Sequence, residues 1–426
     1  MNGCALFSLI TQPMSEQKKD PFLAFRYREF VYYMIANFLF TVGFMVQEVI
    51  IGYELYRLTS DPKAIGFIGL SYALPFMALS LVGGHLADKL SKKKILLLSI
   101  CGIATCTLVL YFISKMMTTE EAAHSLKYII YGVVAVTGGF YAFFSPTASS
   151  LKPFLVPRHA YENAASWGSA GWQTGAIVGP GISGFIYNWV GFSNTLVVVI
   201  GLFAAVFFCI LLIADRKIET QTEGNIWQKV KEGIAFVATT RMLLYSISLD
   251  LFAVLFGGVV AILPVFATDI LKVGPGWLGV LRAAPSVGAV LTLFLLSFTS
   301  VMGKAWRNML LAVAGFGVAT IVFALSKNVW LSIVALFFTG AFDAISVVVR
   351  QTILQIIVPD EMRGRVGAVN GIFLSASNEL GAFESGMAAS WLGTVRSVVA
   401  GGALSLLIVG TVWMKSRDLF GVNLRA

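Results

Sequence analysis

The chain is dominated by apolar runs that are long enough to cross a lipid bilayer as helices. A membrane-spanning helix needs about 20 mostly apolar residues, and six such runs precede residue 215 while six follow residue 241. The runs fall near residues 31–53, 65–87, 93–114, 127–151, 162–189, 193–214, 242–268, 277–300, 306–326, 329–350, 365–392 and 396–414. We therefore predict an all-α polytopic membrane protein with twelve transmembrane helices.

Composition supports a lipid bilayer as the surroundings. Of the 426 residues, 57% are hydrophobic and 12% are charged, which is too little polar surface to coat a water-soluble globule of this size. The net charge of +9 does not indicate nucleic acid, because the basic residues are spread over loops between apolar runs. The four cysteines show neither a disulfide framework nor metal-ligand spacing, and we expect no metal site.

A charged turn between the second and third runs sets the orientation. Residues 83–94 carry four lysines, and basic residues in short loops stay on the cytoplasmic side of a membrane. By that rule the N-terminus, the even-numbered loops and the C-terminal tail hold 23 of the 31 Lys and Arg residues. We therefore expect both termini in the cytoplasm.

The chain divides into five parts. We predict a cytoplasmic tail over 1–28, a six-helix bundle over 29–214, a linker over 215–241, a second six-helix bundle over 242–414 and a cytoplasmic tail over 415–426. Apolar and charged residues alternate along 225–239 as in an amphipathic helix lying on the membrane surface. The N-terminal segment lacks the basic start of a signal peptide. Residues 1–13 precede a second methionine, and we assign them no function.

The two bundles repeat in sequence. At a constant offset of 202 residues, a Val-Pro pair, a Gly, a Ser-Gly pair, a Trp and a second Gly recur. The matched positions are 156–157 and 358–359, 179 and 381, 183–184 and 385–386, 189 and 391, and 191 and 393. An offset of 210 pairs Gly69, Ala73 and Pro75 with Gly279, Ala283 and Pro285. Two related bundles enclose a site near the membrane midplane, as alternating access requires.

The turn between helices 2 and 3 resembles the signature of the major facilitator superfamily of secondary transporters. Family members carry a glycine, then an aspartate and a basic residue, then a second glycine and further basic residues. The matching positions here are Gly84, Asp88, Lys89, Lys92 and Lys93. The departure is Ser91, which stands where the family has glycine. The resemblance extends over essentially the whole chain, from about Arg26 to Lys415.

The resemblance implies that this turn closes a cytoplasmic gate in the outward-facing state. A carboxylate at the end of helix 2 can interact with the positive N-terminal end of helix 11 and with nearby arginines, here Arg363 and Arg365. The alternative is that the lysines only orient the helices while Asp88 offsets their repulsion.

Helix 5 resembles the signature that exporters of the superfamily carry. Its small residues allow close helix approach and its proline allows a bend. The residues are Gly175, Gly179, Pro180 and Gly184, with Ser183 in place of one glycine. Ordinary small-residue packing is the structural alternative.

Helices 10 and 11 give the narrowest resemblance, to the bacterial efflux branch that includes the enterobactin exporter. It rests on Arg350-Gln351, Arg363-Gly364-Arg365 and residues 377–381 and 383–386. It implies efflux across a bacterial cytoplasmic membrane and only hints at a siderophore. Helix 4 lacks the arginine that drug/proton antiporters of the superfamily carry there. The sequence therefore does not identify the residue that couples transport to protons.

Ionisable side chains deep in a membrane usually face a cavity and mark a pathway. Asn37, Thr41 and Glu48 share one face of helix 1, and Glu379 and Glu384 lie about 140° apart on helix 11. The candidate cavity residues are Asn37, Thr41, Glu48, Asp250, Arg282, Asp343, Glu379 and Glu384. Alternatives stay open: Asp250 solvated near the cytoplasmic end, Glu48 or Asp343 in buried polar pairs, and Arg282 either extended to the surface or a counter-ion.

A carboxylate in a low-dielectric cavity tends to keep its proton, as a proton-coupled carrier needs. We expect a monomeric exporter of a small drug-like, amphiphilic or siderophore-type molecule, driven by a proton gradient and needing no cofactor. The excess of carboxylates favours a cationic substrate. An enzyme is not indicated, because no nucleophile with a base and no phosphate-binding loop is present. An importer and a non-transporting receptor or scaffold are the alternatives.

Overall fold

Every regular element is helical or a helical turn in the part of the chain that the structure describes. The computed structural model describes residues 20–116, 120–215, 226–296, 298 and 302–421. The helices are α1 (Arg28–Thr59), α2 (Pro62–Lys89), α3 (Lys92–Met116), α4 (Glu120–Leu151), α5 (Tyr161–Leu211), α6 (Ile226–Thr239), α7 (Arg241–Gly257), α8 (Leu263–Val265), α9 (Pro275–Leu296), α10 (Ala305–Leu325), α11 (Val329–Ile357), α12 (Asp360–Leu392) and α13 (Thr394–Lys415).

Ten helical segments of the described chain are long and apolar enough to cross a membrane. One of them contains two crossings, because α5 bends at Gly191. α12 has 33 residues but is less apolar than the others. With the second crossing in α5 and the crossing by α12 added to these ten, the described chain supports the predicted twelve crossings.

The bends at Gly191 and Gly393 confirm the internal repeat. Gly191 has a φ of 77° and Gly393 a φ of 85°, and they are the two glycines with positive φ in the described chain. They stand at the 202-residue offset and turn the chain into the last helix of each half. Residues with a Cβ rarely adopt this backbone conformation.

The crossing predicted near 242–268 is present, but it is not one regular α-helix. α7 ends at Gly257, and the chain continues as a 3-10 turn (Val259–Ile262), α8 and a π-helical turn (Phe266–Ile270). Pro264 has no backbone N–H to donate, and the Gly258 carbonyl accepts a 3.1 Å hydrogen bond from the Ser385 hydroxyl of α12.

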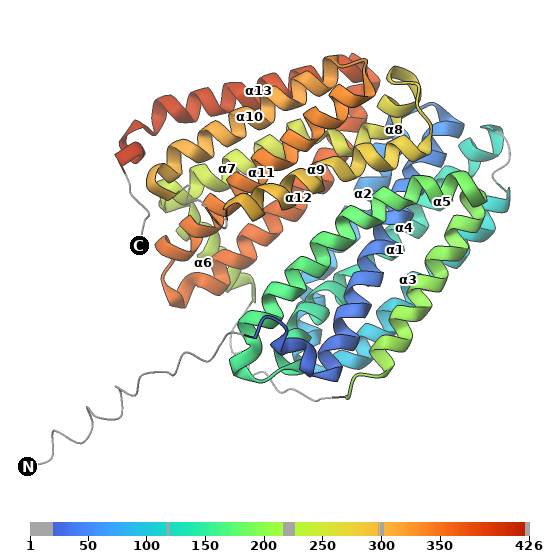
Figure 1. Ribbon diagram of the computed structural model, residues 1–426, viewed down its shortest axis with the longest axis horizontal. Coiled ribbons are helices and arrows are strands. Elements are labelled where there is room, and N and C mark those ends of the chain that lie inside the picture. Colours follow the sequence, from blue (N-terminus) through green and yellow to red (C-terminus); the bar gives the residue numbers. More distant parts are fainter. Residues whose placement is uncertain (1–19, 117–119, 216–225, 297, 299–301, 422–426) are drawn as a thin grey trace, which may run out of the picture.

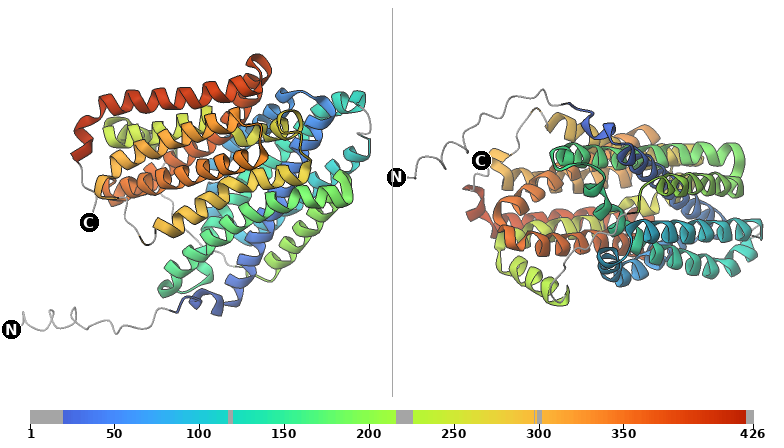
Figure 2. Two further views of the ribbon diagram at one scale, coloured as in Figure 1. Left: turned by 45° about the horizontal axis from the view of Figure 1, so that its top comes forward. Right: turned by 90° about the horizontal axis from the view of Figure 1, so that it is seen from below.

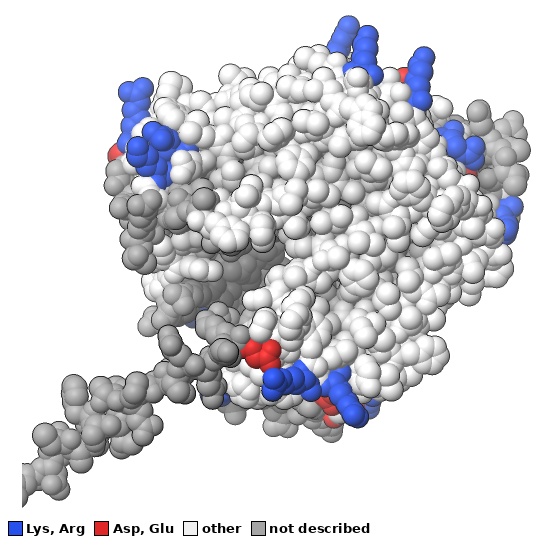
Figure 3. Space-filling view, in the orientation of Figure 1, with Lys and Arg blue, Asp and Glu red and all other residues white. Residues whose placement is uncertain are grey.

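The two halves lie side by side, with α1–α5 in one and α7–α13 in the other (Figures 1 and 2). We call the end that carries α6 and the start of α1 the linker end, and the end that carries Gly191 and Gly393 the distal end. On the face shown in Figure 3, charged side chains gather at the rims and a broad uncharged surface lies between them. Such a belt suits contact with lipid.

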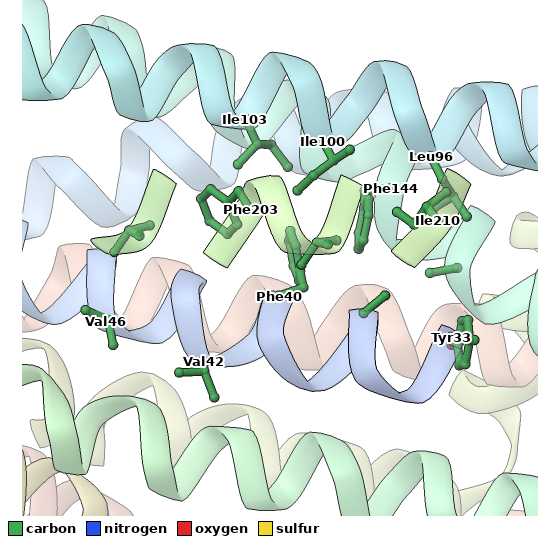
Figure 4. Close-up of a cluster of buried hydrophobic side chains, with 14 of the residues drawn as sticks. Tyr33, Phe40, Val42, Val46, Leu96, Ile100, Ile103, Phe144, Phe203 and Ile210 are labelled. Carbon is green, nitrogen blue, oxygen red and sulfur yellow. The ribbon is translucent and has the colours of Figure 1, made fainter. Parts of the chain in front are cut away.

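Each half has its own apolar core, and the halves share a third core at the distal end. In the first half, Phe40, Phe144 and Phe203 pack with aliphatic side chains of α1, α3 and α5 (Figure 4). The shared core joins side chains of α1 and α2 to side chains of the C-terminal half, including Tyr53, Tyr56, Ile65, Leu263, Phe266 and Ala389. Toward the linker end the described surface is hollowed between the halves (Figure 3).

Candidate functional site: a central cavity between the halves

Two large lobes of one cavity lie between the halves, each of about 440 Å³. Met45, Glu48, Trp172 and Asn378 line both lobes, so the lobes are continuous. Ligand pockets of this size are common in proteins that bind small molecules.

The first lobe has an aromatic wall supplied by the N-terminal half. Asn37 and Thr41 line this lobe together with Glu48, as their shared face of α1 predicts. Aromatic rings from α1, α2, α4 and α5 surround them: Tyr33, Phe40, Phe44, Tyr72, Phe76, Tyr141, Phe144 and Trp172. Many of these rings contact one another, with the Phe40 and Phe144 ring centres 4.2 Å apart. Offset and edge-to-face ring packing makes such a wall rigid and apolar.

An ion pair joins the halves at the junction of the lobes. The Arg282 guanidinium on α9 donates a hydrogen bond to the Glu48 carboxylate on α1. Arg282 is mostly buried, whereas the Glu48 side chain is 42% exposed to the cavity. Both residues also line a smaller pocket of about 100 Å³ toward the distal end. Arg282 is therefore the counter-ion of a carboxylate, which was one of the two alternatives.

Two further charges pair inside the C-terminal half. Asp250 on α7 and Arg350 on α11 form an ion pair whose side chains are 5% and 2% exposed. The alternative of a solvated Asp250 is therefore wrong, because the fold covers it with α11. Asp343 lines the second lobe, and no basic side chain of the described chain pairs with it.

The last two candidates lie on α12. Glu384 is half-buried and is absent from the lining of the two lobes, which α12 reaches through Asn378 and Ala382. The side chain of Glu379 lies outside the described residues. A role for either carboxylate stays a prediction.

The distal end is closed by contacts between the halves. The Tyr56 hydroxyl on α1 donates a 2.5 Å hydrogen bond to Asp269 in the π-helical turn. Gly184 of α5 packs on Pro275 and Gly276 of α9, and the repeat-related pair Gly386 and Gly66 packs α12 on α2. Glycine allows backbones to approach where any side chain would clash. The first lobe extends from Glu48 toward the linker end as far as Tyr33 and Ser149.

Comparison with known proteins identifies the family to which this chain belongs. Residues 19–419 match the family model described as transmembrane secretion effector, a family of the major facilitator superfamily. The chain belongs to this family. It is a major facilitator transporter, with a multi-pass membrane fold, and not an enzyme.

Relatives and solved structures agree with the family. The chain is 26% identical over 367 residues to the multidrug efflux pump Tap of Mycolicibacterium fortuitum, covering 81% of this chain and 85% of Tap. It is 26% identical over 394 residues to the enterobactin exporter EntS of Salmonella typhimurium, covering 88% and 89%. The fold resembles a bacterial homologue of the human lysosomal transporter Spinster, with a TM-score of 0.70 and 15% identity, over 92% of this chain and 98% of the homologue.

The described residues of the gate signature make contacts within the N-terminal half and between α12 and α6. Lys92 is buried and donates a 2.6 Å hydrogen bond to the Ala87 carbonyl, while Lys93 donates a 2.7 Å bond to the Leu211 carbonyl. These lysines therefore fasten the turn within its own half. Arg365 pairs with Glu232 of α6 at 2.6 Å. The predicted gate depends on Asp88, Lys89 and Arg363, whose side chains lie outside the described residues, so the gate stays a prediction.

The exporter signature of α5 contacts two other helices, α1 and α9. A Cβ on Gly175 would lie 2.9 Å from Thr41, and one on Gly179 would lie 2.7 Å from the Cβ of Met45, both on α1. The Pro180 carbonyl accepts a 2.7 Å hydrogen bond from the buried Ser183 hydroxyl, and Gly184 meets α9. A Cβ on Gly84, by contrast, would have no heavy atom within 4 Å.

Several residues of the site were missed from the sequence. The aromatic wall could have been found, because Tyr33, Phe40 and Phe44 continue the α1 face that carries Asn37 and Glu48. Nothing in the neighbouring sequence indicated a role for Tyr56 or Asp269, or the pairing of Arg350 with Asp250. Among the described residues, no three His, Cys, Asp or Glu side chains gather as metal ligands.

Proposed function

We propose that the protein exports amphiphilic organic cations across the bacterial cytoplasmic membrane by alternating access, as a monomer driven by an inward proton gradient. The observation that carries this proposal is the charge and shape of the cavity. An aromatic lobe from one half faces a lobe lined by the Asp343 carboxylate, which has no basic partner in the described chain, while Arg282 neutralises Glu48.

The cavity charge favours cations over anions. If all described ionisable side chains of the two lobes carry charge, Glu48, Arg282 and Asp343 together leave one negative charge. Aromatic faces attract organic cations by cation–π interaction, typically by about 0.5–2 kcal/mol. The name of Tap agrees with drug-like compounds, whereas the name of EntS suggests a siderophore, which the negative cavity disfavours.

Orientation follows from the distribution of basic residues. With the linker end in the cytoplasm, the first lobe extends toward the cytoplasmic side, and the Tyr56–Asp269 contact closes the outer side. Rocking of the halves would then open the distal end and release the substrate.

The test uses everted membrane vesicles and ethidium, a planar aromatic cation. Vesicles that contain the protein should accumulate ethidium when energised to an acidic interior, and a protonophore should abolish the accumulation. Vesicles from cells with an empty vector give the background. Accumulation that equals this background would contradict the proposal, and energised uptake of an anionic catecholate instead would favour a siderophore.

A further inference from the structure

The C-terminal half holds a chain of polar groups beside the cavity. Asp343, Ser346 and Arg350 lie three and four residues apart on α11 and so share one face of that helix. Asp250 reaches this face from α7 and pairs with Arg350. Asp250 follows the first residue of α7 by nine positions, roughly 14 Å of helix, so the pair lies well inside the membrane-spanning region.

The Asp250–Arg350 pair leaves buried polar atoms without a protein partner. The Nε and Nη2 atoms of Arg350 and the Oγ atom of Ser346 are buried and make no hydrogen bond within the described chain. A buried donor without a partner is costly, and ordered water commonly satisfies it.

A small void lies beside Ser346 and the Asp250 partner of Arg350. It measures about 10 Å³, is lined by Asp250, Asp343 and Ser346 together with apolar side chains, and matches the space that one water molecule needs. Asp343 lines both this void and the second lobe of the cavity. Among the described carboxylates of these pockets, Asp343 alone connects the two spaces.

We infer that Asp343 is the proton-carrying group of the transporter, and that Ser346 and the Asp250–Arg350 pair position it through water in this void. The inference rests on the proposed function. Water on the acidic side of the membrane donates one proton to the Asp343 carboxylate while the distal end is open. Asp343 returns that proton to cavity water once the linker end is open, so each cycle moves one proton inward.

Polar groups at the void make the ionised state accessible. An isolated buried carboxylate is strongly disfavoured, but the Ser346 hydroxyl and a water molecule in the void can donate hydrogen bonds to ionised Asp343. Arg282 faces Asp343 across the second lobe from α9, Asp250 faces it from α7, and α10 contributes the apolar Val313 and Phe316. From α12 the described lining is Asn378 and Ala382.

Purified protein in proteoliposomes, with ethidium as probe, separates coupling from binding. Wild type should accumulate ethidium when the lumen is acidic and should exchange bound for free ethidium without a gradient. Asp343→Asn should lose gradient-driven accumulation at least tenfold yet retain exchange at saturating ethidium, since the aromatic lobe is intact. Asp343→Glu should restore part of the coupling. Asp418→Asn removes an exposed carboxylate beside Arg241 and is the matched control.

The positioning residue is tested by proton release. Ethidium binding to detergent-solubilised wild type should release close to one proton into weakly buffered solution, and Asp343→Asn should release none. Ser346→Ala should shift the pH at which release is half-maximal, whereas Ser405→Ala, on a buried serine bonded to its own helix, should not.

Two outcomes would overturn the inference about Asp343, and a third, distinguishable from them, would overturn the proposed function. Undiminished gradient-driven accumulation by Asp343→Asn would overturn the inference alone. Loss of exchange at saturating ethidium together with accumulation would also overturn it, because Asp343 would then be needed for folding or for the rocking of the halves and not for coupling alone. Failure of wild type to accumulate ethidium would overturn the proposed function itself.

Discussion

Glu48 of α1 and Arg282 of α9, 234 residues apart in the chain, form an ion pair that links the two halves at the junction of the cavity lobes. Arg282 neutralises a carboxylate that would otherwise attract a cationic substrate. The pair also links the halves in the present conformer. Opening of the distal end must pull these two side chains apart.

Replacing Arg282 by Met should free Glu48 to bind the cation. A partly exposed ion pair contributes on the order of 1 kcal/mol, so the KM for ethidium should fall by about fivefold while turnover slows. Initial rates of vesicle uptake measure both quantities. Arg396→Met, at an exposed distal position, is the control. The double variant with Glu48→Gln should return KM toward wild type, and an unchanged KM in the single variant would refute a binding role for Glu48.

Tyr56→Phe should open the distal end more often. The variant loses the hydrogen bond to Asp269, and a hydrogen bond to a charged group contributes about 1.5–3 kcal/mol, so the distal-open population should rise at least about tenfold. The measurement is labelling of Ala382→Cys, in a background with the native cysteines replaced, by a membrane-impermeant thiol reagent added outside cells. Tyr128→Phe changes an exposed tyrosine and should leave the labelling rate unchanged. Equal rates in both variants would show that the contact does not hold the end closed.

Gly184→Ala should abolish transport by wedging α5 away from α9. A Cβ at this position would overlap the Pro275 carbonyl oxygen and lie 2.9 Å from the Gly276 Cα, and backbone atoms cannot yield as a flexible side chain can. Gly181→Ala, whose Cβ would lie 3.9 Å from its nearest neighbour, should transport at the wild-type rate. The same uptake assay tests both, with surface expression measured alongside. Normal transport by Gly184→Ala would mean that this contact is looser than the structure shows.

Gly83 rather than Gly84 should be the glycine on which folding depends. A Cβ on Gly83 would overlap the Ala142 carbonyl oxygen of α4, whereas one on Gly84 would enter open space. Overpacking costs typically 1–3 kcal/mol, so Gly83→Ala should lower the melting temperature of the detergent-purified protein and Gly84→Ala should not. If Gly84→Ala melts normally but fails to transport, the family signature acts in gating; a lower melting temperature for Gly84→Ala alone would contradict the packing argument.

The pattern of apolar runs was enough to predict the membrane-spanning helices. It did not predict where the chain departs from a regular helix. Apolar length predicts the crossings, and the 202-residue repeat predicts that Gly191 and Gly393 occupy equivalent positions. The break after Gly257 was missed, because the apolar run continues through it. The break is stabilised by Ser385, which lies 127 residues further along the chain.

By itself, the sequence determined that this is a two-fold repeated membrane protein with charges inside the bilayer, since length, apolarity and the face of a helix are properties of neighbouring residues. Only the tertiary structure decided how those charges combine: Glu48 with Arg282, Asp250 with Arg350, and Asp343 beside a water-sized void, with no basic partner among the described residues. The physical reason is that pairing depends on how each helix is rotated and which helix lies next to it. Packing between segments a hundred or more residues apart sets both, and periodicity within one helix does not record them.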